Sequence, residues 1–176
     1  MRKLLNEELP RLSKEEFKKH QKTTVVIVLD NVRSRLNVGS VFRTADAFLI
    51  EAIYLCGITG VPPNREIHKT ALGATDTVSW KYFAATDEAI IELKKEAFKI
   101  ISIEQAENAT MLNEFVPQKG EKYAVVFGNE VEGVAQEVVS ASDIVIEIPQ
   151  YGMKHSLNIA VSVGVVIWDL TCKMRK

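Results

Sequence analysis

The sequence predicts an α/β fold in which a mostly parallel sheet carries helices on both faces. The first observation is a continuous β-branched run, TVVIVL at 24–29, which is typical of a strand buried on both faces. The second is that further apolar runs alternate along the chain with segments whose apolar residues recur at helical spacing. The third is that polar residues and glycines stand where strands pass into helices, which is where α/β proteins gather their ligand loops.

The elements follow one another in a simple order. The first 22 residues are a charged, helical extension, in which Ser13 followed by Glu16 has the capping-box pattern of a helix start. Residues 23–176 are expected to form one domain, since the chain is long enough for a substantial core. After the first strand we expect a helix at 38–48, a strand at 52–56, a loop at 61–64, a short helix at 66–73, a helix at 87–95 capped by Thr86 or Asp87, strands at 98–103 and 123–127, a helix at 132–142, a strand at 144–148 and a helix at 158–174.

Composition limits the possible partners and location. A net charge of −1 argues against binding nucleic acid by bulk electrostatics and leaves room for a local basic patch, such as the one at 14–22. The longest apolar stretch, 159–168, is too short to span a bilayer, and the acidic N-terminus lacks the apolar core of a signal peptide. The three histidines share no metal-ligand spacing with each other or with the two cysteines. We therefore expect a cytoplasmic protein with no membrane partner and no metal.

Two common nucleotide-binding patterns are missing. The segment after the first strand has no G-x-G-x-x-G turn, and no P-loop pattern occurs anywhere in the chain. The glycines cluster late instead, at 128, 133, 152 and 164, so a nucleotide-like ligand would be held by C-terminal loops. His155 beside Ser156 invites a hydrolase hypothesis, but a G-x-S-x-G elbow is absent and we discount hydrolysis.

Three segments carry a resemblance to a known family. They are NVGSVFRTADAF at 37–48, FGNEVEG at 127–133 and IPQYGMKHSLN at 148–158. In this order they resemble motifs 1, 2 and 3 of the SpoU (TrmH-like) RNA 2′-O-ribose methyltransferases of the SPOUT superfamily, and the resemblance spans roughly residues 23–172. It implies a C-terminal deep trefoil knot, S-adenosyl-L-methionine as methyl donor, tRNA or rRNA as substrate, and a homodimer. The sequence does not choose between tRNA and rRNA.

The resemblance also implies the residues of the site. The cofactor loops would contribute Ile103, Gly128, Ile148, Gly152 and Leu157, with the two glycines allowing close backbone approach. The catalytic set would be Arg43, Asn37, Glu130, Ser156 and Asn158. A guanidinium stays protonated in proteins, so Arg43 is expected to grip the 3′ phosphate or polarise the 2′-hydroxyl, although proton removal by a phosphate-activated arginine stays open. Asn37 and Glu130 would orient Arg43, while Ser156 and Asn158 would contact the ribose and the methionine end. The ordinary alternative for Ser156 is a helix N-cap.

Other interpretations remain at this point. A knotted methyltransferase acting on a base nitrogen is one, and a non-catalytic RNA-binding module is another. Two residues depart from the family pattern, since Gln150 stands where an apolar residue is common and Ile103 where threonine is frequent. The final helix is apolar nearly all round, which predicts a dimer interface, or else cover by the N-terminal extension. The broad apolar face of this final helix carries Ile159, Val163, Val166, Ile167 and Leu170. The opposite side of the helix carries Val161, Val165 and Trp168.

Overall fold

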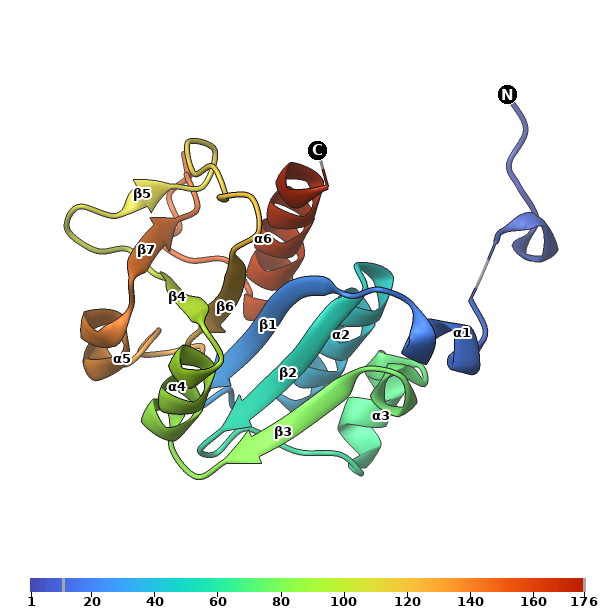
Figure 1. The fold of residues 1–176 in the computed structure, drawn as a ribbon, viewed down its shortest axis with the longest axis horizontal. Helices are drawn as coiled ribbons and strands as arrows, with labels where there is room; N and C mark the ends of the chain where they lie inside the picture. The colour runs from blue at the N-terminus through green and yellow to red at the C-terminus, as the bar shows by residue number, and fades with distance from the viewer. Residues whose placement is uncertain (11, 176) are drawn as a thin grey trace.

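The computed structural model describes residues 1–10 and 12–175 and contains one parallel sheet in this part of the chain (Figure 1). The strand order is β3-β2-β1-β6-β4-β7-β5. The strands are β1 (Thr23–Asp30), β2 (Ile50–Cys56), β3 (Ser79–Phe83), β4 (Phe98–Ile103), β5 (Thr110–Met111), β6 (Lys122–Phe127) and β7 (Ile144–Glu147). The helices are α1 (Lys14–Lys19), α2 (Arg35–Ala47), α3 (Arg65–Ala71), α4 (Thr86–Lys95), α5 (Gln136–Ala141) and α6 (Ile159–Met174), with 3₁₀ turns η1 (Asn6–Glu8) and η2 (Ala74–Asp76). The predicted α/β class with a mostly parallel sheet is confirmed.

The first strand is the centre of the sheet and is covered on both sides. Ile27 pairs with Ile53 of β2 and with Val125 of β6. Alternate residues of β1 belong to two separate apolar cores, one on each face of the sheet. This burial on both faces is the reason for the uninterrupted β-branched run.

Three layers result from this arrangement. Helices α2, α3 and α6, together with Phe17 of α1, form the core on one face. Helices α4 and α5 form the core on the other face (Figure 1). Among the described residues, no helix is long and apolar enough to cross a membrane.

Several element boundaries differ from the sequence prediction. Strand β3 was missed because only two residues of this exposed edge strand, Trp80 and Phe83, are half-buried and they do not alternate, and β5 was missed because it has two residues. The helix predicted at 132–142 begins only at Gln136, since the residues before it form a tight loop. Helix α4 is capped by neither predicted residue: its N-cap is Ala85, and the Thr86 hydroxyl donates instead to Asp30. In the extension, the Ser13–Glu16 capping box is confirmed, and the α-helix it starts has six residues.

Helices α2 and α3 are in unusually close contact. A Cβ placed on Gly39 of α2 would lie 2.1 Å from Thr70 Oγ1 and 2.3 Å from the Ile67 carbonyl oxygen of α3. The Thr70 hydroxyl donates a 2.8 Å hydrogen bond to the Leu36 carbonyl of α2. Glycine at position 39 therefore lets the backbones of the two helices meet.

Helix α6 has two different sides. Its predicted inner face is buried, with Val163, Val166, Ile167 and Leu170 fully covered. On the other side Val161 is 51% exposed, Val165 38% and Trp168 57%. The N-terminal extension does not cover these three side chains, so that alternative to a dimer interface is not what the structure contains.

Candidate functional site

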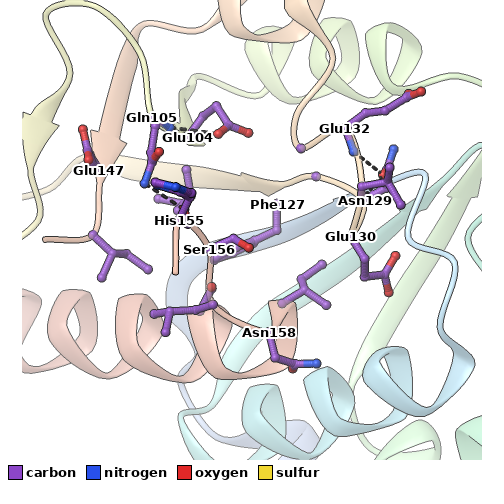
Figure 2. A pocket seen from close by; sticks show the side chains of 18 of the residues that line it. Glu104, Gln105, Phe127, Asn129, Glu130, Glu132, Glu147, His155, Ser156 and Asn158 are labelled. Atoms are coloured by element: carbon purple, nitrogen blue, oxygen red, sulfur yellow. Dashed lines mark hydrogen bonds between the residues drawn. The ribbon is translucent and has the colours of Figure 1, made fainter. Parts of the chain in front are cut away.

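A cavity of about 450 Å³ opens at the carboxyl ends of three neighbouring strands, β4, β6 and β7. Ligand sites of parallel α/β proteins occur at this edge of the sheet. The walls come from the ends of the strands and from the loops that follow them, 128–133 after β6 and 148–158 before α6 (Figure 2). The lining residues are Ile103, Glu104, Gln105, Phe127, Gly128, Asn129, Glu130, Val131, Glu132, Gly133, Glu147, Ile148, Gln150, His155, Ser156, Leu157, Asn158, Ile159 and Ser162.

The loop after β6 is tightly folded. Asn129 and Gly133 exchange two backbone hydrogen bonds, of 3.0 and 3.1 Å, and the Asn129 side-chain oxygen accepts from the amides of the two residues that follow Glu130. A Cβ on Gly128 would lie 1.9 Å from the Gly133 carbonyl carbon. Gly133 itself has φ +71°, in the left-handed region. Both glycines are therefore steric requirements of this loop.

Glu130 connects this loop to the start of α2. Its carboxylate accepts from the amides of Arg33 and Ser34, at 3.0 and 3.1 Å, and from Asn37 Nδ2 at 3.0 Å. Partial desolvation raises the pKa of the Glu130 carboxyl, but these hydrogen bonds outweigh it and leave the pKa below its usual value. Glu130 is thus held as a carboxylate that fixes the residues before and inside the first turn of α2.

Asn37 and Asn158 complete a chain of side chains that links all three sequence segments. Asn158 Nδ2 donates to Asn37 Oδ1 at 3.3 Å, while Asn158 Oδ1 accepts from the Ala160 amide at 2.9 Å. Asn158 is therefore the N-cap of α6, and the N-cap alternative for Ser156 is wrong. Figure 2 shows Glu130 and Asn158 at one end of the cavity, with His155 and Ser156 further along its wall.

Four of the five residues predicted to hold a cofactor line the cavity, namely Ile103, Gly128, Ile148 and Leu157. Gly152 is not among the lining residues, and a Cβ placed on it meets no atom within 4 Å. Its cofactor role, which the family resemblance implies, stays a prediction.

The predicted catalytic residues divide into two groups. Glu130, Ser156 and Asn158 line the cavity, and Asn37 is hydrogen-bonded to two of them. Arg43 is exposed on α2 and does not line the cavity. The structure therefore brings four of the five together and leaves the arginine outside this cavity.

Sequence reasoning missed several polar residues of the wall. Glu104 accepts from the Val134 amide at 2.9 Å, and Gln105 donates to the His155 carbonyl at 3.0 Å, so both fasten the loops to each other. The available signal was their position directly after the buried strand at 98–103, because polar residues at this point face the loop edge of a parallel sheet. Glu147 occupies the equivalent position at the end of β7.

The wall has a clear chemical character. Apolar side chains of strand ends and loop starts form part of it, and four carboxylate residues form another part: Glu104, Glu130, Glu132 and Glu147. Such a cavity suits a ligand with an apolar planar group and a positive charge. In residues 1–10 and 12–175, no group of three or more histidine, cysteine, aspartate or glutamate side chains is placed to hold a metal ion.

Comparisons with known proteins agree with the motif resemblance. The model of the SpoU rRNA Methylase family matches residues 24–168. The tRNA (guanosine(18)-2'-O)-methyltransferase of Aquifex aeolicus is 29% identical over 170 residues, which are 94% of this chain and 76% of that protein. The 23S rRNA (guanosine-2'-O-)-methyltransferase RlmB of Neisseria meningitidis serogroup B is 27% identical over 143 residues, 81% of this chain and 56% of the relative.

Solved structures agree on the fold. The A. aeolicus TrmH/SpoU tRNA modifying enzyme superposes with a TM-score of 0.80 at 25% identity, over 92% of this chain and 80% of that one. The AdoMet-bound rRNA methyltransferase from Sinorhizobium meliloti gives a TM-score of 0.78 at 24% identity, over 88% and 59% of the two chains. Because the family model covers most of the sequence and the three motif segments meet at one cavity, the chain belongs to the SpoU rRNA methylase family.

Proposed function

We propose that this protein is an S-adenosylmethionine-dependent RNA methyltransferase that methylates a ribose 2′-hydroxyl. The observation that carries the proposal is the hydrogen-bonded chain from Glu130 through Asn37 to Asn158, which joins the three motif segments at the rim of one cavity. The relatives support the reaction, since their names specify 2′-O-methylation of guanosine in tRNA and in 23S rRNA. The proposal covers both classes of RNA.

The cavity fits the proposed methyl donor. Its volume of about 450 Å³ lies in the range of small-ligand pockets. Ile103, Ile148 and Leu157 supply apolar wall for an adenine ring, and Gly128 leaves backbone exposed to it. The carboxylates balance a sulfonium and an ammonium group. When bound, S-adenosylmethionine supplies a methyl group that is already electrophilic, so the protein has to position the hydroxyl and assist loss of its proton.

Glu130 is not the base in this scheme. Both of its oxygens accept hydrogen bonds from the start of α2, and its lowered pKa makes it a weak proton acceptor. Asn158 is also engaged through both of its amide atoms. We assign these two residues and Asn37 the role of positioning the loops. Ser156 faces the cavity and is assigned to the ribose hydroxyl.

Arg43 belongs to the RNA half of the proposed site. Its exposure on α2 leaves the guanidinium accessible to a phosphate, for which the planar group has five donors. In this role it binds the phosphate next to the target ribose and polarises the 2′-hydroxyl.

The decisive experiment locates the methyl group. Purified protein is incubated with methyl-labelled S-adenosylmethionine and total tRNA or rRNA, and the RNA is then hydrolysed with alkali. A 2′-O-methyl group blocks cleavage at its own phosphodiester, so the label should appear in alkali-resistant dinucleotides. Label in mononucleotides would indicate base methylation instead, and no label with tight cofactor binding would favour a non-catalytic RNA-binding module.

The oligomeric state, the knot and the location are part of the proposal. A homodimer is supported by the exposed apolar side of α6, which needs cover. A knotted C-terminal segment is supported by membership of the SpoU rRNA methylase family and by the likeness of the fold to the A. aeolicus TrmH/SpoU enzyme. A cytoplasmic location stays a prediction that accompanies the tRNA and rRNA substrates of the relatives.

Sedimentation equilibrium tests the dimer. At micromolar concentration the protein should have twice the mass of one chain, and Trp168→Glu should shift it toward the monomer by placing a charge on the apolar side of α6. Lys95→Glu on α4 is the matched control and should leave the mass unchanged. A wild-type monomer that still methylates RNA would rule out a functional dimer.

A further inference from the structure

A second cavity lies on the opposite part of the sheet, and none of the three motif segments lines it. Its volume is about 560 Å³, and it is enclosed by the 61–64 loop, α3, η2 and β3. It shares no lining residue with the first cavity. Figure 1 shows α3 and β3 at the edge of the sheet remote from β7 and α5.

The lining combines one aromatic ring with an arginine and a histidine. Trp80 of β3 is half-buried and packs against the core beneath α2 and α3, so the ring is supported from one side. Arg65 and His68 also line the cavity, are exposed, and stand three positions apart on α3, which places them on one side of that helix. The cavity thus contains a stacking surface beside groups that bind phosphate.

The one carboxylate among the lining side chains is already paired. Lys14 of α1 donates to Asp76 Oδ2 at 2.8 Å. Lys14 is also the main cause of the lowered pKa of the Asp76 carboxyl, with smaller contributions from His68 and Lys18. Glu66, next to Arg65 in sequence, lies 3.9 Å from Arg35. The region around the cavity is therefore cationic on balance, although the whole chain has a net charge of −1.

The second cavity lies beside the part of α2 that carries Arg43. Gly39 is in contact with α3, and Asp46 accepts a 2.8 Å hydrogen bond from Thr77, directly after η2. Arg43 is four residues after Gly39 and three before Asp46, so all three share one edge of the helix. That edge faces the elements that enclose the cavity.

We propose that the second cavity binds one unpaired nucleotide of the RNA substrate, with its base stacked on Trp80 and its phosphate held by Arg65 and His68. The inference rests on the proposed function, because that function makes RNA the substrate and Arg43 its contact. Unpaired bases are recognised in this way, by an aromatic face and nearby cations, and every base offers a ring face. A chain without bulk positive charge needs such a local site to hold RNA.

Tryptophan fluorescence tests the site without relying on methyl transfer. The chain has two tryptophans, Trp80 and Trp168. In Trp168→Phe the emission comes from Trp80 alone, and a 12-nucleotide single-stranded RNA should quench it in a saturable manner when its base stacks. Trp80→Phe is the matched protein, in which the remaining Trp168 should show no saturable quenching.

The outcomes separate this site from the proposed function. Quenching of Trp80 supports the site whether or not the protein transfers methyl groups. A protein that methylates RNA but shows no quenching of Trp80 overturns the site and leaves the function intact. If the protein shows neither quenching of Trp80 nor methyl transfer, both the nucleotide site and the proposed function are overturned. Equal quenching of both tryptophans overturns the nucleotide site.

Kinetics provide a second measurement with variants whose side chains are exposed. Arg65→Ala should raise the KM for RNA on the order of tenfold with little change in kcat, and should leave S-adenosylmethionine affinity unaltered. Lys95→Ala on α4, which covers the other face of the sheet, removes the same charge as a control. An equal rise in KM in both variants would mean that only general charge matters, and would overturn the nucleotide site.

Discussion

The two cavities of this protein differ in how they are built and in the charge they present. The first is made of loops at the carboxyl ends of β4, β6 and β7, relies on glycines, and carries four glutamates. The second is made of a short helix and an edge strand, and presents an indole with Arg65 and His68. Helix α2 lies between them, bonded to Glu130 at its start and docked on α3 further along.

The difference in charge between the two cavities fits a small domain that binds two ligands of opposite charge at separate places. A sulfonium donor is favoured by carboxylates, whereas RNA is favoured by arginine and lysine. Placing the two charge types at separate regions avoids their mutual neutralisation. Substitutions on one side should therefore affect one ligand and spare the other, and the following tests examine that separation.

Arg43→Ala is expected to have the largest effect. Methyl transfer should fall by about 10²–10³-fold, the cost of losing one electrostatic donor at a reacting centre. S-adenosylmethionine affinity, measured by calorimetry, should stay nearly intact. Arg43→Lys should fail as well, because a point charge lacks the planar fork. Lost cofactor affinity in a folded variant would contradict the assignment of Arg43 to the RNA side.

Gly128→Ala should act on the cofactor side. The new Cβ would overlap the Gly133 carbonyl carbon, so the loop has to open, at a cost of about 1–3 kcal/mol in unfolding free energy and at least about tenfold in S-adenosylmethionine affinity. Urea unfolding and calorimetry measure the two effects. Gly164→Ala is the control, since a Cβ there meets no atom within 4 Å and a helical position favours alanine. Equal behaviour of the two variants would contradict the steric role of Gly128.

Glu130→Gln should weaken the connection between the two sides. Because Glu130 is exposed, solvent screens the charge contribution to its hydrogen bonds. We therefore expect a loss of about 1 kcal/mol in unfolding free energy at pH 7. The folded-state pKa of Glu130 is below its usual value of 4.5, so the carboxylate stabilises the fold above that pH. The contribution is lost as pH falls below 4.5 through the folded-state pKa. Urea unfolding across this range should show the wild-type advantage shrinking, and an advantage independent of pH would contradict the ionised role.

Gly152→Val should have the smallest effect. Open space around the position predicts an unfolding free energy within about 0.5 kcal/mol of wild type. If the 148–158 loop closes on S-adenosylmethionine, affinity should fall a few-fold while stability is unchanged. Unchanged affinity would remove Gly152 from the cofactor set.

Much of the fold could be predicted from the sequence because periodicity and burial agree in most elements. The β-branched run at 24–29 and the apolar spacing of 38–48 correspond to β1 and α2. The edge strand β3 escaped because SWKYF lacks a buried face. The helix start at 132 was wrong because the Asn129–Gly133 hydrogen bonds, and not local propensity, determine where the chain turns.

The candidate site could be predicted in part. The motif segments identified Asn37, Glu130 and Asn158, whose side chains do meet. Two further residues of the cavity wall, Glu104 and Gln105, act through contacts with residues 30 and 50 positions away, which no local pattern reveals. The second cavity escaped for the same reason, since Trp80 and Arg65 come together only when α3 packs beside β3.

Asn37 is a residue through which the two cavity regions are connected. Its amide group donates to the loop that lines the first cavity and accepts from the cap of α6, while its own helix carries Arg43. A ligand that tightens either hydrogen bond changes the free energy of placing α2, and linkage is reciprocal. The factor by which S-adenosylmethionine alters RNA affinity must equal the factor by which RNA alters S-adenosylmethionine affinity. Asn37→Ala should bring both factors toward one, so that each ligand binds as though the other were absent.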